Sequence, residues 1–343
     1  MLDDLQYIHQ RDSQDALGIA NKEWQQLQYE FQSDWQPQNN IESIIVTGMG
    51  GSALAATVAQ AWLNPELPFE VVRNYDLPAY ANAQTLVIVS SYSGNTEETL
   101  SALHDAEHRG CQIVILASDG ELVNIAQQKS YPLLRLPSGL QPRMAVFYNL
   151  AALTKLFVLA GICPTDRLSE LKDTSQWLHE YCDSWYVDVP TKTNQAKSIA
   201  QDLIGKSIVI YSGPRLFPAA YKWKISFNES AKHIAWVNQL SEFNHNEMLG
   251  WTKQPVDKPY VVIDLRSSLE HERIQKRFAV TEQLLSGMRP EPIVVSVVGE
   301  TILQQLIWAI TLGDFVSLYT ALLGNIDPTP VELIEKFKKT LAE

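Results

Sequence analysis

Short apolar runs rich in β-branched residues alternate with longer amphipathic segments along most of the chain of 343 residues. Such runs predict strands that are buried on both faces of a sheet. The segments between them have the apolar spacing of helices that cover the sheet. In the first half the expected strands are 43–47, 69–73, 85–90 and 112–116, and the expected helices are 53–63, 97–109 and 145–162.

The same order of elements returns in the second half. Strands that alternate with helices predict a parallel sheet covered on both faces, so the expected fold class is α/β, with two doubly wound parallel-sheet domains in tandem. The expected strands are 207–211, 260–264 and 292–297, and the expected helices are 218–233, 270–285, 301–323 and 331–341. The predicted parts are a helical segment 1–40, a first domain 41–163, a helical connection 164–200, a second domain 201–326 and a C-terminal helical segment 327–343.

The composition indicates which binding partners and cofactors the protein is expected to lack. The chain is 45% hydrophobic and 19% charged, which is ordinary for a globular protein. Its net charge of −12 argues against nucleic acid or an anionic membrane surface as the main partner, because both attract basic surfaces. The three cysteines are widely spaced without a CxxC pair, so neither a disulfide framework nor a zinc site is expected. The polar N-terminus lacks the apolar core of a signal peptide, and we expect a cytoplasmic location.

The first candidate site is the sequence GMGGS at 48–52, between a predicted strand and a predicted helix. Glycines let the backbone approach a ligand closely, and a helix N-terminus offers free N–H groups and a partial positive charge. Together they make an anion site. A dinucleotide fingerprint fits less well, because the motif ends in Ala53 and no convincing acidic residue follows at the required spacing. A plain strand-to-helix turn remains the alternative.

The second candidate site is SSYSGNTEET at 90–99, at another predicted strand-to-helix transition. Ser93 or Asn95 could simply cap the helix, but one cap leaves most of the hydroxyls unexplained. Hydroxyls and N–H groups at a helix start suit a phosphate monoester, and the missing lysine excludes a nucleotide P-loop. The hydroxyls are those of Ser90, Ser91, Ser93, Thr96 and Thr99.

GMGGS followed by SYSGNTEET resembles the sugar isomerase (SIS) domain. In the second half, NESAKH at 228–233 and LSEFNHNEMLGW at 240–251 resemble the bifunctional phosphoglucose/phosphomannose isomerase family. Pro142-Arg143 and DPTPV at 327–331 extend the resemblance over nearly the whole chain. It implies an enzyme that interconverts glucose 6-phosphate, and mannose 6-phosphate, with fructose 6-phosphate. It also implies no metal or other cofactor, and a homodimer with shared active sites.

The resemblance also implies the site residues. Glu229 would be the base that transfers the proton, Arg143 would stabilise the enediolate, and His245 would help to open the ring, often from the partner subunit. A lysine of the last helix would assist the ring oxygen. Lys338 fits the family pattern best, with Lys336 and Lys339 left open. Gly50, Gly51, Ser52, Ser91, Ser93 and Thr96 would hold the phosphate and neighbouring sugar hydroxyls.

The reaction independently requires these residue types. Moving a proton between C1 and C2 needs a base such as a carboxylate, and the enediolate needs a lasting positive charge such as arginine. Ring opening needs a further acid–base pair, which histidine and lysine can supply. A non-catalytic role of Glu229 is the alternative. It could be a solvated helix residue, and His233, four residues later on the predicted helix, could merely pair with it.

Two other functions compete. A non-catalytic sugar-phosphate sensor would use the same fold, but no helix-turn-helix with a basic surface is evident. An isomerase that makes an amino sugar would need an ammonia-supplying domain, which the sequence does not show. We expect a homodimer partly because the bulky apolar residues exceed what a small acidic monomer would expose, among them Trp223, Trp236, Trp251 and Trp308.

Overall fold

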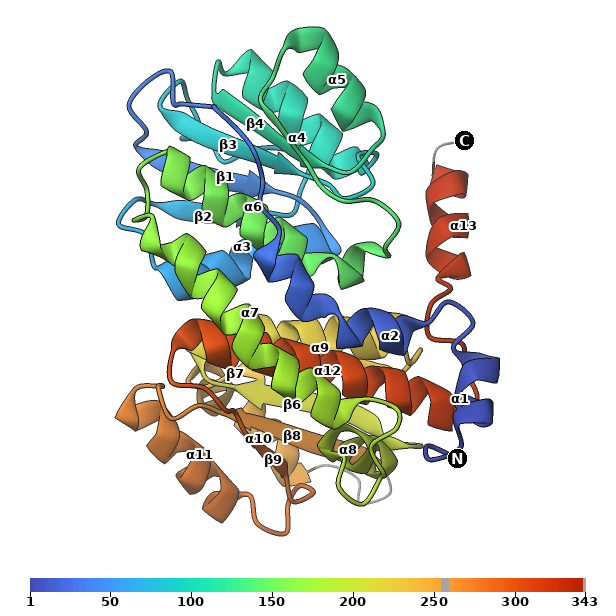
Figure 1. Cartoon of the computed structure of the whole chain (residues 1–343). Helices are drawn as coiled ribbons and strands as arrows, with labels where there is room; N and C mark the ends of the chain where they lie inside the picture. Colours follow the sequence, from blue (N-terminus) through green and yellow to red (C-terminus); the bar gives the residue numbers. More distant parts are fainter. Residues whose placement is uncertain (254–258, 342–343) are drawn as a thin grey trace. The chain divides into compact units, whose positions relative to one another are not determined.

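The computed structural model describes residues 1–253 and 259–341, and the chain divides into two compact units (Figure 1). The first-sheet unit is Glu23–Trp177. The second-sheet unit combines Met1–Lys22 with Leu178–Glu343. Each unit contains an open parallel sheet with helices on both faces, which confirms the predicted α/β class with two doubly wound domains in tandem.

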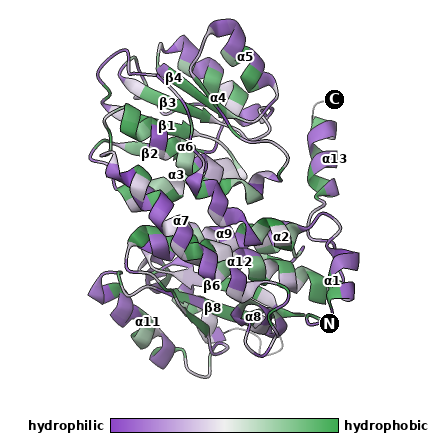
Figure 2. Cartoon of the chain, viewed as in Figure 1, coloured by the Kyte–Doolittle hydropathy of each residue, from purple (hydrophilic) through white to green (hydrophobic). Residues whose placement is uncertain are grey.

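The first sheet has five parallel strands in the order β2-β1-β3-β4-β5. Every residue of β1, β3 and β4 is buried, because helices cover both faces, and the strands are accordingly continuous apolar runs (green in Figure 2). The three-residue strand β5 was not predicted from the sequence. The strands are β1 (Ser43–Thr47), β2 (Phe69–Val72), β3 (Thr85–Ser90), β4 (Gln112–Ala117) and β5 (Leu133–Arg135).

Helices α4 and α5 cover one face of this sheet, and α3 packs against α6 on the other (Figure 1). Helix α3 begins at Gly50, three residues before the predicted start, so the glycine motif itself forms the first helical turn. The helices are η1 (Glu23–Gln28), α3 (Gly50–Leu63), α4 (Glu97–His108), α5 (Glu121–Lys129), η2 (Pro142–Met144), α6 (Val146–Leu159) and α7 (Asp166–Trp185), the last of which continues into the second-sheet unit.

The second sheet has four parallel strands in the order β7-β6-β8-β9. The edge strand β7, of sequence AWVNQ, was not predicted, because it mixes polar and apolar residues without a clear period. Its strands are β6 (Ser207–Ser212), β7 (Ala235–Gln239), β8 (Tyr260–Arg266) and β9 (Ile293–Ser296). The helices of this unit are α1 (Leu5–Arg11), α2 (Ala16–Asn21), α8 (Gln195–Leu203), η3 (Pro214–Leu216), α9 (Phe217–Glu229), η4 (Glu242–His245), α10 (Glu247–Gly250), η5 (Trp251–Lys253), α11 (Glu272–Leu284), α12 (Ile302–Leu323) and α13 (Glu332–Leu341).

Two sequence-based expectations about helices are wrong. The segment 1–40 is helical only as far as Gln28. After that residue the chain is not helical, and at 38 and 39 its backbone N–H groups donate to the Gln112 side chain of β4. Helix α9 ends at Glu229, because Lys232 adopts a left-handed conformation with φ 53°. His233 therefore lies outside the helix, and the suggested helical pairing with Glu229 is excluded.

Helix α12 is the central helix of the second-sheet unit. Among the described residues it alone is long and apolar enough to cross a membrane, but it is almost entirely buried and packs against α8 and α9. Gly313 of α12 lies directly under the indole ring of Trp223, where a Cβ atom would collide. Trp223, Trp308 and Trp251 are buried within the chain, so the expectation that a monomer would have to expose them is wrong. Of those four tryptophans only Trp236 is exposed.

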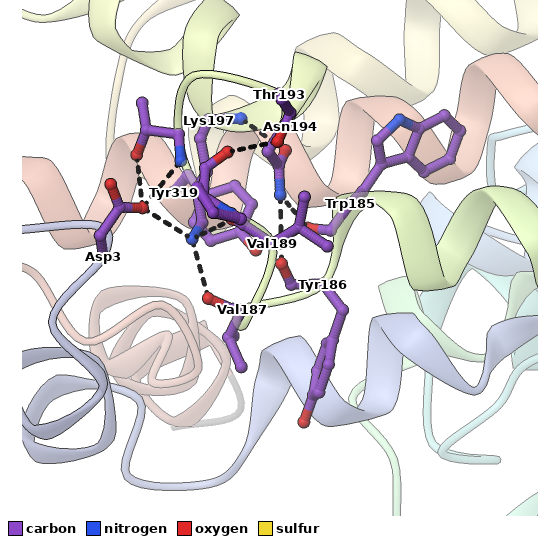
Figure 3. A network of polar contacts seen from close by, with 11 residues as sticks. Asp3, Trp185, Tyr186, Val187, Val189, Thr193, Asn194, Lys197 and Tyr319 are labelled. Atoms are coloured by element: carbon purple, nitrogen blue, oxygen red, sulfur yellow. Dashed lines mark hydrogen bonds and ion pairs between the residues drawn. The ribbon is translucent and has the colours of Figure 1, made fainter.

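A buried polar network orders the connection between α7 and α8 and includes the N-terminal segment (Figure 3). The amine of Lys197 is fully buried, donates to the carbonyls of Val187 and Val189 at 2.8 Å each, and lies 3.3 Å from the carboxylate of Asp3. Burial lowers the pKa of Lys197, and Asp3 opposes this shift. Asn194 donates to two carbonyls of the same connection. Contacts of this kind explain why the first residues of the chain belong to the second-sheet unit.

Candidate active site

The two predicted phosphate motifs lie at one end of the first sheet. The chain runs from β1 to β2 on one side and then to β3 on the other side of β1, so the strand order reverses between β1 and β3. The loop at the carboxyl end of β1 is GMGGS, and the loop at the carboxyl end of β3 begins at Ser91. Open α/β sheets bind ligands in the crevice at this point of reversal.

Close backbone contacts join the two loops into one surface. The backbone N–H of Tyr92 donates to the Ser52 hydroxyl at 3.2 Å, and a Cβ atom on Gly48 would come within 2.6 Å of the Ser90 carbonyl oxygen. A Cβ atom on Gly51 would likewise come within 2.5 Å of a carbonyl oxygen in η2. Glycine at this position lets η2 approach the start of α3, which brings Arg143 to the same end of the sheet, where its side chain is buried.

The starts of α3 and α4 face this surface with free backbone donors. The N-cap residues are Met49 and Thr96, and neither side chain makes a capping hydrogen bond in the described structure. The first N–H groups of a helix lack intrahelical acceptors and attract anions. The simpler alternative, in which Ser93 or Asn95 caps α4, does not hold. The Asn95 side chain instead accepts from the backbone N–H of Glu121 at 2.9 Å and so caps α5.

The hydroxyl cluster separates into three groups. The hydroxyls of Ser91 and Thr96 lie beside the start of α4 and are hydrogen-bonded to each other at 2.8 Å, so one hydroxyl hydrogen of the pair is left for a bound oxyanion. The Ser90 hydroxyl instead donates to the buried side chain of Asn149, and Thr99 is buried inside the unit. Ser93 is exposed on the loop. The structure therefore brings together the following predicted phosphate-binding residues, with Arg143 buried nearby: Gly50, Gly51, Ser52, Ser91 and Thr96.

The strand order of the second sheet reverses in the same way, between β6 and β8, but there a side chain of the protein occupies the position. Glu270, which follows β8, accepts a hydrogen bond from the backbone N–H of Arg215 at 2.8 Å and lies against Gly213, which follows β6. Burial raises the pKa of Glu270, and the backbone donors of Arg215 and Leu216 oppose this shift. A carboxylate thus occupies the position at which the first sheet offers open donors. Sequence reasoning missed Glu270, because its partners lie 55 residues away.

The predicted acid–base residues all belong to the second-sheet unit. Glu229 is the last residue of α9 and is half-buried, and His245 is the exposed last residue of η4. Lys338 lies on α13, all of whose described residues are exposed, as are Lys336 and Lys339. Exposure therefore does not distinguish among the three lysines. Arg143 and the predicted phosphate-binding residues belong to the other unit, so the predicted site residues are divided between the two.

Comparisons with known proteins agree with this architecture. Residues 39–159 match the SIS domain family, and residues 192–341 match the bacterial phospho-glucose isomerase C-terminal SIS domain. A bifunctional phosphoglucose/phosphomannose isomerase from Caldicellulosiruptor bescii is 36% identical over 89% of this chain and 91% of its own length. A protein of the same name from Aquifex aeolicus is 31% identical over 92% of this chain and 95% of its own.

Solved structures show the same fold. A glucose-6-phosphate isomerase-like protein from Thermus thermophilus aligns with a TM-score of 0.63 over 98% of both chains, at 18% identity. Fold and matches together define a phosphosugar isomerase built from two SIS domains. The chain belongs to the bifunctional phosphoglucose/phosphomannose isomerase family, as its motifs indicated.

The open donors of the first sheet predict one phosphate-binding site per chain. Replacing Ser91 by Ala together with Thr96 by Val removes the hydroxyl pair, so the affinity for inorganic phosphate should fall by about tenfold or more. Isothermal titration calorimetry measures both the affinity and the stoichiometry. The matched control is Thr57→Val with Ser184→Ala, whose hydroxyls donate to carbonyls of their own helices. Unchanged affinity in the first double variant, or two sites per chain in the parent, would contradict the assignment.

Proposed function

We propose that the protein interconverts glucose 6-phosphate and mannose 6-phosphate with fructose 6-phosphate. The observation that best supports this is the anion site at the end of the first sheet, with the Ser91–Thr96 hydroxyl pair and open helix starts beside buried Arg143. A phosphate monoester matches these donors without a metal ion. The relatives from Caldicellulosiruptor bescii and Aquifex aeolicus carry the name of an isomerase with both activities.

In the proposed reaction the phosphate anchors the substrate and the ring then opens. His245 and the α13 lysine, for which Lys338 is our candidate, supply the acid and base that protonate the ring oxygen and deprotonate the C1 hydroxyl of the aldose. Glu229 removes the C2 proton of the open-chain aldose and returns it to C1 of the enediolate. Arg143 stabilises the enediolate oxygen, because a guanidinium stays positively charged throughout the reaction.

The two substrates differ only in configuration at C2. An enediolate is planar at C2, so glucose and mannose 6-phosphate give the same intermediate once the proton has left. A single base can serve both epimers if the C1–C2 segment is able to rotate before deprotonation. Both aldoses should therefore form from fructose 6-phosphate in one active site.

Substituting the proposed base tests this function. Glu229→Gln keeps the shape of the side chain but cannot accept the proton, so turnover of fructose 6-phosphate to both aldoses should fall by roughly 10²–10⁴. The assay separates glucose 6-phosphate from mannose 6-phosphate by chromatography, and circular dichroism checks the fold. The control is Glu272→Gln, an exposed residue of α11. Activity within tenfold of the parent in Glu229→Gln would exclude this residue as the base.

We propose further that the protein is a homodimer in which His245 of one chain serves the site that contains Glu229 of the other. Exposed apolar residues near both residues support an interface. Ile234, just before the edge strand β7, exposes 63% of its surface, and Trp236 within that strand exposes 49%. Leu249 of α10 exposes 75%. Large apolar side chains exposed this far are candidates for burial against a second subunit.

Mixing two inactive variants tests the shared site. Glu229→Gln and His245→Ala homodimers should each be nearly inactive. After subunit exchange about half of the dimers are mixed, and each mixed dimer holds one intact site, so up to roughly a quarter of the parental activity should return. Native mass spectrometry verifies the exchange. If activity does not return although mixed dimers form, both residues serve the site of one chain.

A further inference from the structure

The loop that carries His245 is anchored to α11 on the N-terminal side of this residue. The Asn244 side chain donates to the Thr281 hydroxyl at 2.9 Å and accepts from the Arg277 guanidinium at 3.2 Å. Phe243 is completely buried, with its ring 4.5 Å from that of Tyr211. The backbone immediately before His245 is therefore held by two polar contacts and by the core.

A second anchor lies two residues after His245. One carboxylate oxygen of Glu247 accepts a hydrogen bond from the phenol of Tyr211 on β6, and the other accepts from the Asn238 amide on β7 at 2.6 Å. Trp251 in turn donates to the Tyr211 oxygen at 2.9 Å. Burial raises the pKa of Tyr211, so the phenol stays protonated and can donate to Glu247. The loop is thus fixed to two adjacent strands of the sheet.

His245 itself is exposed between these anchors, at the end of a 3₁₀ turn of four residues. So short a turn has few internal hydrogen bonds and depends on its surroundings for a fixed orientation. An exposed side chain on a firmly held backbone is the arrangement that a catalytic group needs when it must meet a substrate at a defined place.

We propose that Glu247 is a positioning residue for His245, and that it acts through its hydrogen bonds to Tyr211 and Asn238. The inference rests on the proposed role of His245 in ring opening. Without the Glu247 anchor the loop can rotate, and the imidazole meets the substrate less often in the right geometry. Substrate binding is unaffected, because the phosphate-binding residues belong to the first-sheet unit.

Exchanging the amide of Asn238 with the carboxylate of Glu247 tests this role. Glu247→Gln leaves two donors, Tyr211 and Asn238, facing a single acceptor oxygen, so kcat should fall by about tenfold while KM and phosphate affinity stay constant. In the double variant Asn238→Asp with Glu247→Gln, the new amide donates to the new carboxylate and still accepts from Tyr211. The second oxygen of the new carboxylate can keep the bond to the backbone N–H of Gln239. Most of the lost kcat should therefore return.

A double-mutant cycle separates positioning from a structural effect. If Glu247 acts through His245, then Glu247→Gln should lower kcat in the parent but change it less than twofold in the His245→Ala background. A full tenfold loss in both backgrounds, or no rescue by the exchanged pair, would overturn the inference. The kcat of His245→Ala alone reports on the proposed function: a parental value would refute the role of His245 itself, independently of Glu247.

Two controls complete the design. Glu272→Gln makes the same chemical change at an exposed site of α11 and should leave kcat unaltered. If Glu247→Gln does not fold, Tyr211→Phe removes one of the same two hydrogen bonds and takes its place in the cycle. A smaller loss of kcat that again vanishes in the His245→Ala background would support positioning, and an equal loss in both backgrounds would contradict it.

Discussion

The backbone N–H groups at the starts of the helices that follow parallel strands are the constraint on which the rest depends. Each such helix has donors that lack intrahelical acceptors, and the fold gathers them where the strand order reverses. In the second sheet Glu270 supplies the acceptor from within the chain. In the first sheet the donors around Ser52 and Thr96 remain open. The fold is therefore repeated, and one carboxylate distinguishes the second point of reversal from the first.

This difference explains how two similar units can have different roles. The first-sheet unit has the residues that we propose hold the phosphate, together with the buried guanidinium of Arg143. The second-sheet unit has Glu229, His245 and the lysines of α13, which are suited to proton transfer. Tandem copies of one domain can divide binding and chemistry in this way without any change of topology. Glu247 shows how the second copy could support that chemistry, since its contacts hold the backbone beside an exposed histidine.

The sequence predicted those parts of the fold that have a strong local pattern. Strands β1 and β3, buried on both faces, appear as continuous apolar runs and were located to the residue. The edge strand β7 has no such pattern, and the end of α9 depends on the left-handed backbone of Lys232, which hydrophobic periodicity does not encode. The pairing of Ser91 with Thr96 was foreseeable because both residues belong to one motif. The bonds of Glu270 to Arg215 and of Glu247 to Tyr211 were not, since these partners lie 55 and 36 residues away.

The central claim is that this phosphosugar isomerase works by carboxylate-mediated proton transfer through an enediolate. The most direct measurement follows hydrogen at C2 while fructose 6-phosphate is converted in heavy water. The base exchanges its proton with solvent, so nuclear magnetic resonance should find deuterium at C2 of both glucose 6-phosphate and mannose 6-phosphate. Aldoses that form at the parental rate but retain only protium at C2, even at equilibrium, would indicate direct hydride transfer and contradict the account.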